Sequence, residues 1–311
     1  MTSSAPRLLL LDTASLYFRA FFGLPETLTA PDGTPVNAVR GLLEFIATLV
    51  REYEPDAIAA CWDNDWRPAW RVELIPSYKA HRVEQERTQG PDAEETPDLL
   101  AAQVPLIAQA LELLDIAVVG ADEHEADDVI GTLASTWDGP VDVVTGDRDL
   151  FQLVDDAREV RVLYTARGVS NHDVITDHVL VDRYGVAPPA YVDFAVLRGD
   201  PSDGLPGVAG IGDKTAAILL QTYGHIDAIA EAAKDPRQKM APRVRKNLLA
   251  ATDYLAAART VVTVVRDLDL GDPHLLIDDL DEDRRTRFAD FSEQWGLGGA
   301  EGRVIAALDR T

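Results

Sequence analysis

The chain has 311 residues, 46% of them hydrophobic and 26% charged, which is ordinary for a soluble globular protein and long enough for about two domains. The single cysteine, Cys61, excludes an intramolecular disulfide and a cysteine-based zinc site, and the leucine run at 8–11 is too short for a secretion signal or a membrane span. We therefore expect a protein of the reducing cytoplasm without membrane contact. The net charge of −24 argues against a nucleic-acid partner unless the carboxylates gather around cations.

Short apolar runs alternate with helical patterns along the first half of the chain. Buried strands are predicted at 7–12, 57–63, 116–119, 141–147 and 160–165. Helices are predicted, from apolar stripes at helical spacing, at 39–53, 98–114 and 126–137. Strands joined through helices lie parallel, with helices on both faces of the sheet, so the predicted fold class is α/β.

Three of the predicted strands end in an aspartate: Asp12, Asp63 and Asp147. The carboxyl ends of parallel strands share one edge, where the sites of open α/β folds lie. Any one of these acids is explained by helix capping or by the favourable charge of a first helical turn. Capping does not explain seven acids at one edge, namely Asp12, Asp63, Glu125, Asp127, Asp128, Asp147 and Asp149.

This cluster of acids indicates a metal site. Oxygen ligands without histidine or cysteine favour the hard cations Mg²⁺ and Mn²⁺. Several carboxylates suggest two ions about 4 Å apart, the arrangement that serves phosphodiester cleavage. The six histidines are scattered and form no Ser-His-Asp or Cys-His pattern.

A Gly-rich stretch near residue 200 indicates a second functional element. Asp200 and Asp203 lie in a Gly/Pro-rich turn, and a helix is predicted to begin near Lys214. Three of the glycines ahead of this helix are Gly207, Gly210 and Gly212. The stretch resembles the helix-hairpin-helix motif, in which backbone N–H groups approach a DNA phosphate closely. An ordinary turn between two helices is the alternative.

Basic charge gathers in two segments of this acidic chain. Residues 234–246 carry six Lys/Arg against one Asp, and residues 67–87 carry five against three Glu, with Trp70 and Tyr78 between them. Basic side chains with aromatic neighbours are typical of a channel for single-stranded nucleic acid. A solvated basic face is the alternative.

These segments together resemble the 5′-nuclease (flap endonuclease) family, specifically the N-terminal domain of bacterial DNA polymerase I, from residue 7 to at least residue 270. Five motifs stand in the family's order: LLLLDTASLYFRAFFGLP, CWDNDWRPAWRVELIPSYKAHR, EADDVIGTL, TGDRDLFQLV and GDPSDGLPGVAGIGDKTA. The resemblance implies a mostly parallel, PIN-like nuclease core at 1–180 with a helical arch at about 77–100. A helix-hairpin-helix subdomain with the C-terminal helices would follow at 181–311.

The resemblance also implies which residues act. The metal ligands would be the seven acids above together with Asp200 and Asp203. Lys79 and Arg82, at the base of the arch, would be the catalytic cations that contact the scissile phosphate. DNA contacts are implied for Arg19, Arg71, Tyr78, Lys79, Arg82, Gly207, Gly210, Gly212, Lys214 and Thr215. The cofactors would be two or three Mg²⁺ or Mn²⁺ ions, with a K⁺ ion at the hairpin turn.

The activity that the resemblance implies is that of a 5′-3′ exonuclease and 5′-flap endonuclease with a two-metal-ion mechanism. It would leave a 5′-phosphate and a 3′-hydroxyl. Its substrates would be DNA with a 5′ flap, nick, gap or recessed 5′ end, and RNA primers on DNA, in Okazaki-fragment processing and repair. Because the chain stops at residue 311, we expect a monomer that works beside a separate polymerase, in the cytoplasm at the nucleoid.

Two segments depart from the family pattern, and a third has no assigned contact. The segment after Arg82, VEQERTQGPDAEETPD, is longer and more acidic than usual, which bears on arch threading and on the preference for gaps or flaps. Gly204 stands where asparagine is common and is expected to loosen the turn that presents Asp203. The acidic segment 267–285 is expected to be a solvated helical tail that packs on the hairpin subdomain.

Other functions are alternatives. A related metal-dependent ribonuclease is disfavoured by the hairpin motif, which tracks a DNA duplex. A non-catalytic clamp for DNA junctions is disfavoured by the complete set of carboxylates. A phosphatase would need a second aspartate two residues after Asp12, where Ala14 stands.

Overall fold

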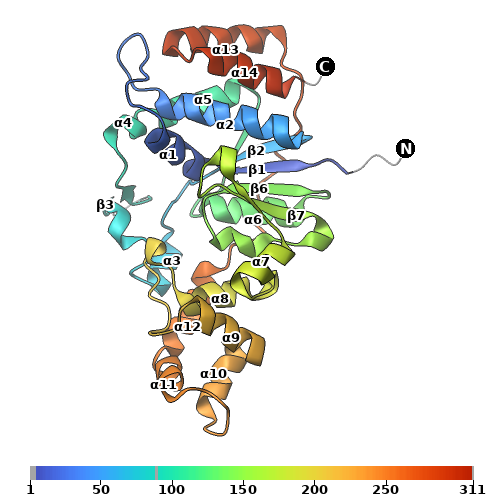
Figure 1. Cartoon of the computed structure of the whole chain (residues 1–311). Helices are drawn as coiled ribbons and strands as arrows, with labels where there is room; N and C mark the ends of the chain where they lie inside the picture. The colour runs from blue at the N-terminus through green and yellow to red at the C-terminus, as the bar shows by residue number, and fades with distance from the viewer. Residues whose placement is uncertain (1–4, 88–89, 310–311) are drawn as a thin grey trace.

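Six strands form one sheet, in the order β5-β2-β1-β6-β7-β8, in this computed structural model, which describes residues 5–87 and 90–309. The strands are β1 (Leu8–Asp12), β2 (Ala57–Trp62), β5 (Ala117–Gly120), β6 (Val141–Thr145), β7 (Val160–Tyr164) and β8 (Asp173–Ile175). The strands from β5 to β7 pair in parallel, and β8 is antiparallel to β7 (Figure 1). The five predicted strands and the α/β fold class are confirmed.

The strands are apolar along their whole length because both faces of the sheet are covered. In β1, all four leucines are 0% exposed. Leu8 and Leu10 belong to the core under α6 (Ala126–Thr136), whereas Leu9 and Leu11 belong to the core under α2 (Asn37–Tyr53) and α5 (Val104–Leu113). The alternation follows from the two-residue repeat of a strand. One apolar run thus contributes to two hydrophobic cores.

The helix predicted at 98–114 is interrupted. The structure has α4 (Asp98–Ala101) and α5 there, with Gln103 between them. The buried Gln103 side chain accepts a hydrogen bond from the Ala38 N–H at 2.8 Å, and so caps the first turn of α2. Pro105 suits the start of a new helix because it has no N–H to lose.

The predicted helical arch is a β-hairpin instead. Residues 83–94 contain β3 (Val83–Gln85) and β4 (Ala93–Glu94), paired antiparallel, and we call this segment the arch hairpin. Its sequence suits a turn rather than a helix, because Gly90 has a positive φ of +74° and Pro91 follows it. The expectation of a helical arch is therefore wrong for the described residues of this segment.

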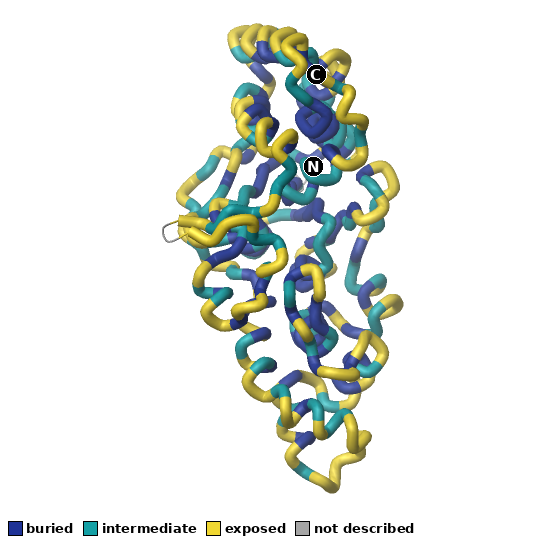
Figure 2. The backbone as a smooth tube through the Cα atoms, turned by 90° about the vertical axis from the view of Figure 1, so that its left-hand side faces the viewer, coloured by how far each residue is buried: buried dark blue, intermediate teal, exposed yellow. Residues whose placement is uncertain are grey.

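A helical region lies on one side of the sheet (Figure 1). It contains α7 (Asp177–Tyr184), α8 (Tyr191–Arg198), α9 (Asp213–Tyr223), α10 (Ile226–Lys234), α11 (Pro242–Ala250) and α12 (Thr252–Val262). The helix predicted to begin near Lys214 is α9. The end of this region farthest from the sheet, where α10 and α11 lie, is mostly exposed (Figures 1 and 2). Among the helices of the described residues, none has the length and hydropathy to cross a bilayer.

The C-terminal segment does not pack on the hairpin subdomain, so that expectation is wrong. Its chain passes the start of β2, where Ile58 N–H donates to the Leu275 carbonyl at 2.8 Å. It then forms α13 (Glu282–Trp295) and α14 (Gly299–Leu308) beside α2 and α5 (Figure 1). Phe288, Phe291 and Val304 are buried in that core. Although the segment is rich in acidic residues, its apolar side chains form one buried stripe, and the packing of this stripe against the core fixes the position of the segment.

Replacing Phe288 by alanine tests whether α13 is part of this core. The side chain is 0% exposed, so Phe288→Ala should lower the free energy of unfolding by about 3–5 kcal/mol. Urea denaturation would measure it. The matched control is Arg287→Ala on the exposed side of the same helix, which should stay within about 0.5 kcal/mol of the wild type. Equal effects of the two changes would contradict the packing described here.

Candidate active site

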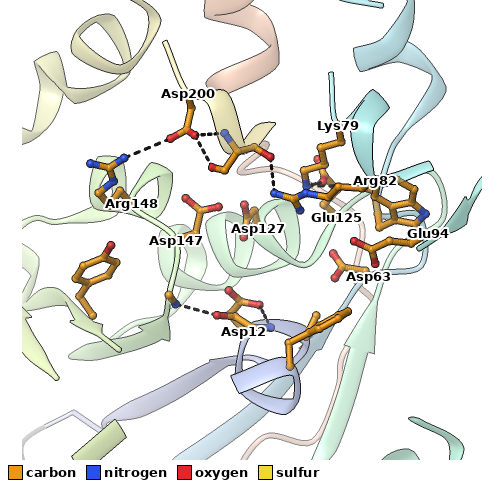
Figure 3. Close-up of a pocket in the computed structure, with 17 residues that line it drawn as sticks. Asp12, Asp63, Lys79, Arg82, Glu94, Glu125, Asp127, Asp147, Arg148 and Asp200 are labelled. Atoms are coloured by element: carbon orange, nitrogen blue, oxygen red, sulfur yellow. Dashed lines mark hydrogen bonds and ion pairs between the residues drawn. The ribbon is translucent and has the colours of Figure 1, made fainter. Parts of the chain in front are cut away.

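A cavity of about 430 Å³ opens at the carboxyl edge of the sheet, where β1, β2 and β6 end (Figure 3). We call it the carboxylate cavity. Cationic side chains lie on its wall as well, those of Lys79, Arg82 and Arg148. Seven acidic residues line it: Asp12, Asp63, Glu94, Glu125, Asp127, Asp147 and Asp200. The structure therefore brings together six of the nine predicted metal ligands.

Asp12 both caps a helix and lines the cavity. It ends β1 and precedes α1 (Thr13–Gly23), and its Oδ1 accepts the Ser15 N–H at 3.2 Å. Its Oδ2 accepts the Thr145 hydroxyl at 2.6 Å, which ties β1 to the end of β6. Asp63, just after β2, likewise accepts the Ala126 N–H at the start of α6, at 2.7 Å. Capping thus explains the local fold here, and it also orients two carboxylates toward the cavity.

The loop after β6 places two further acids. The Asp147 carboxylate accepts the Asp149 N–H at 2.8 Å. The Asp149 side chain lies deeper, 7% exposed, and its Oδ1 is buried without a hydrogen-bond partner among the described residues. A buried carboxylate oxygen without a donor is costly, so this oxygen would suit a cation as a ligand.

Burial and mutual repulsion raise several pKa values. Burial, with Asp63 and Asp147 adding to it, raises the pKa of Asp12 from 3.8 to about 7. Burial and then the charges of Asp147 and Asp12 raise the pKa of Asp127 well above its ordinary value.

The same effects act on the acids farther along the cavity. Burial and then Asp147, Asp203 and Asp200 raise the pKa of Asp149 well above its ordinary value. Burial raises that of Asp203 to about 6, with Asp147 contributing. Asp147 stands among the neighbours of both groups of acids, so its charge links the two.

These features fit divalent cations. Cations would remove the repulsion and supply a partner for the orphan oxygen of Asp149. Among the described residues, no three of these acids stand close enough to enclose an ion by themselves. Mg²⁺ accepts such a site, because it retains several waters and binds through a few carboxylates plus substrate phosphates.

Glu125 has a different environment from the other acids. Lys79, Arg71 and the Tyr78 hydroxyl all donate to its carboxylate, the last at 2.7 Å. Burial would raise the pKa of Glu125, but Lys79 and Arg71 lower it below its ordinary value. Glu125 is thus held as a carboxylate at the cavity wall, with its charge largely compensated.

Two predicted DNA contacts need correction. Arg71 and Tyr78 are 2% and 4% exposed and lie beneath Glu125, so they present no surface to DNA. They hold Glu125 instead.

Asp128 is fully buried outside the cavity lining. Its Oδ1 accepts from Arg71 at 2.7 Å and from the Val265 N–H at 2.9 Å. Adjacent helical residues point in different directions, but which direction faces the cavity depends on tertiary packing, so the sequence could not assign Asp127 to the cavity and Asp128 to the interior.

The base of the arch is joined to the turn at 200–204. The Lys79 N–H donates to the Asp203 carbonyl at 3.0 Å, and the Arg82 guanidinium donates to the Asp203 carboxylate at 2.9 Å. Gly204, with φ +69°, lies so close to the Ser77 carbonyl that a Cβ would meet this oxygen at 2.0 Å. Only glycine fits there, so Gly204 fastens the turn rather than loosening it, contrary to expectation.

The Gly-rich turn precedes α9 as predicted. Gly207 and Gly210 have positive φ values, and a Cβ at Gly207 would meet the Arg198 carbonyl at 2.4 Å. Among the described residues, no side chain caps the N-terminus of α9, and its first turn carries the exposed Asp213 and Lys214 and the half-buried Thr215. Free N–H groups beside a lysine suit a phosphate. Arg19, another predicted DNA contact, lies outside the carboxylate cavity in a neighbouring groove.

Three residues of the site were not predicted from the sequence. Thr145 orients Asp12, Arg148 lies 3.6 Å from the Asp200 carboxylate, and Glu94 enters the cavity from the arch hairpin. The first two adjoin Asp147 in the motif TGDRD, so their position in the chain was a usable signal. The segment after Arg82 is acidic in sequence, but only the fold of the hairpin turns Glu94 toward the cavity.

Two family models match the chain: the 5′-3′ exonuclease N-terminal resolvase-like domain over residues 7–185, and the 5′-3′ exonuclease C-terminal SAM fold over residues 186–281. The chain belongs to the 5′-3′ exonuclease family. It is 55% identical to a 5′-3′ exonuclease of Streptomyces coelicolor, over 96% of this chain and 99% of that protein. The sequence-based resemblance and the assignment to the nucleases are confirmed.

Other relatives and structures agree with this family. A 5′-3′ exonuclease of Mycobacterium tuberculosis is 47% identical over 97% of this chain and 98% of its own. DNA polymerase I of the same species is 39% identical, over 86% of this chain but 28% of the polymerase. The T5 D15 protein co-crystallised with metal ions has a TM-score of 0.64 at 17% identity, covering 97% of this chain and 100% of that one. The Rad2 catalytic core in complex with DNA substrate has a TM-score of 0.62 at 14% identity, covering 99% of this chain and 93% of that one. These two structures show the shared fold.

The pKa shifts predict a pH-dependent response to Mg²⁺. The folded-state pKa of Asp12, about 7, exceeds its ordinary 3.8, so protonation favours the folded state. This stabilisation is fully present below about pH 4 and is lost as pH rises through about 7. Mg²⁺ should therefore raise the melting temperature more at about pH 8 than at about pH 5. Calorimetry would measure both. Asp12→Asn should reduce the difference, and an equal Mg²⁺ effect at both pH values would contradict the assignment.

Proposed function

We propose that this 5′-3′ exonuclease family member is a structure-specific nuclease that cuts DNA at 5′ flaps, nicks, gaps and recessed 5′ ends with divalent cations in the carboxylate cavity. The supporting observation is the crowding of buried acids with raised pKa values around Asp147, beside Lys79 and Arg82. Repelling carboxylates together with two cationic side chains suit a phosphodiester and the ions that bind it.

Two Mg²⁺ or Mn²⁺ ions, or three, would be held on either side of Asp147. One group of ligands would contain Asp12, Asp63, Glu125 and Asp127, and the other Asp149, Asp200 and Asp203. When bound, such ions lower the pKa of a water and offset charge on the leaving oxygen. Asp128 would contribute indirectly: it accepts a hydrogen bond from Arg71, and Arg71 in turn holds the Glu125 carboxylate in place.

The chain's own cations have definite tasks in this proposal. The Arg82 guanidinium is 34% exposed, and both Lys79 and Arg82 line the cavity. Their charges would stabilise the negative charge that grows on the phosphate as water attacks the phosphorus. The bond from phosphorus to the 3′ oxygen breaks, and that oxygen takes up a proton. The products carry a 5′-phosphate and a 3′-hydroxyl.

Duplex DNA would be held by the turn from Gly207 to Thr215. Its backbone N–H groups and Lys214 suit a phosphate, and a K⁺ ion bound by carbonyls of the turn is part of the proposal. RNA primers on DNA are proposed substrates as well, in replication and repair. A monomer that works beside a separate polymerase is part of the proposal, and two 5′-3′ exonucleases match this chain over nearly their whole length.

A non-catalytic DNA clamp, the first alternative, would not require carboxylates that bind cations. A clamp needs no carboxylate to carry an unpartnered buried oxygen, as Asp149 does. The alternative of a ribonuclease gives no role to the Gly-rich turn and its uncapped helix. Both features favour the nuclease acting on a DNA duplex.

Asp147→Asn is the sharpest test of catalysis. The substrate is a 5′-flap duplex labelled at each end in turn, with Mg²⁺, Mn²⁺ or EDTA. Cleavage should depend on the metal and fall by about 100-fold or more in the variant, because Asp147 stands between the two groups of acids and acts on both.

Binding of the same duplex to Asp147→Asn, measured by fluorescence anisotropy, should persist. Asp272→Asn, an exposed acid on the C-terminal segment, is the matched control and should cleave like the wild type. Unchanged cleavage by Asp147→Asn would exclude the proposed centre, and binding by the wild type without cleavage would favour the clamp.

Lys214→Ala tests the hairpin turn separately. Loss of one phosphate contact should weaken duplex binding and reduce the slope of log K against log[salt] by about 1. A salt titration of binding would measure this slope. Arg287→Ala is the matched control, because this exposed arginine of α13 is already paired with Asp283 at 3.0 Å. Equal slopes of log K against log[salt] for the two variants would show that the Gly-rich turn does not contact the DNA.

A further inference from the structure

The arch hairpin is fastened to the wall of the carboxylate cavity. The Arg67 guanidinium, nearly buried, pairs with the Asp92 carboxylate at 2.6 Å. The Trp66 indole N–H donates to the Asp92 carbonyl at 2.8 Å, and the Glu95 N–H donates to the Arg82 carbonyl at 2.7 Å. These contacts come from both ends of the hairpin and fix its position relative to the predicted catalytic cations.

Glu94 projects from this hairpin into the cavity. Figure 3 places it beside Arg82 and Asp63, and it is half-buried. Its carboxylate has no hydrogen bond or ion pair within the part of the chain that the structure describes. Glu94 is not among the predicted metal ligands and holds no other side chain in place. An anionic group thus faces the space where the phosphates of a substrate would lie.

A groove continues from the cavity along the arch hairpin, and we call it the arch groove. It shares Phe18, Arg82 and Glu94 with the cavity. Three further carboxylates line it, those of Glu84, Glu95 and Asp98. The segment 83–98 as a whole contains six acidic residues and one arginine. A strand of phosphates that followed this groove would meet charge of its own sign.

A second groove, along α1, shares Ser15 and Phe18 with the cavity. It is lined by Arg19, Arg167 and several aromatic residues, and none of its described lining residues is acidic. The two grooves therefore differ in charge although both share Phe18 with the cavity. The difference shows that the acidity of the arch groove is local and is not simply the average of an acidic protein.

We propose that Glu94 is a specificity-determining residue that disfavours a 5′ single strand continuing past the scissile phosphate into the arch groove. The enzyme then cuts nicked, gapped or recessed 5′ ends faster than long 5′ flaps. The inference rests on the proposed nuclease function. A carboxylate in a partly desolvated cavity repels a phosphate more strongly than it would in water, so one residue can set the preference.

Two substrates that share one duplex test this inference, one with a recessed 5′ end and one with a long single-stranded 5′ flap. Cleavage of each is measured in Mg²⁺ by the wild type and by Glu94→Gln, which keeps the size of the side chain. The ratio of flap to recessed-end cleavage should rise about five- to tenfold in Glu94→Gln. Glu293→Gln, an exposed acid on α13, is the matched control and should leave the ratio unchanged.

A flap with uncharged methylphosphonate linkages separates charge from shape. The wild type should cut this neutral flap better than the ordinary flap, and the difference between the wild type and Glu94→Gln should disappear. An unchanged ratio in Glu94→Gln, with cleavage intact, would overturn this inference and leave the nuclease function standing. Loss of cleavage on both substrates with a higher Mg²⁺ requirement would overturn it too, because Glu94 would then belong to the ion-binding group. A wild type that cuts neither substrate would overturn the proposed function itself.

Discussion

Repulsion among buried carboxylates is the constraint around which this molecule is built. Four helix or strand ends deliver acids to one edge of the sheet, and burial makes each charge more costly than it would be in water. Hydrogen bonds from the Ser15 and Ala126 N–H groups and from Thr145 hold individual carboxylates in place. They do not remove the repulsion, as the raised pKa of Asp12 shows. The fold thus stores an electrostatic cost that only cations or protons relieve.

One part of the cluster is compensated by the chain itself. Arg71 and Lys79 neutralise Glu125, and Arg71 also joins Asp128 to the carbonyl of Val261, at 3.1 Å, at the end of α12. Removing the buried Arg71 would leave the Glu125 and Asp128 carboxylates without this partner, which is destabilising. The same network links the nuclease core to the helical region. Through Arg71, the positions of Glu125 and Asp128 are therefore coupled to the position of the helical region that carries the Gly-rich turn.

The arch and the turn at 200–204 form a second link. Lys79, Arg82 and Gly204 all contact across it, and the contact between Gly204 and the Ser77 carbonyl excludes any larger residue. DNA held by the Gly-rich turn would therefore lie at a set distance from the cavity. The C-terminal helices contribute differently, because α13 and α14 complete the core over α2 and leave the cavity edge open.

Local sequence determined the strands, most helices and the acids at the strand ends, because apolar runs, periodicity and capping depend on near neighbours in the chain. It could not separate Asp127 from Asp128, or foresee that Arg71 and Tyr78 are buried, since both depend on what packs against them. The arch hairpin and the place of α13 and α14 were likewise decided by tertiary contacts, those of Arg67 with Asp92 and of Phe288 with the core. The sequence by itself determined which chemical groups are available. Tertiary structure decided which of them face the cavity, because direction and burial are set by residues far away in the chain.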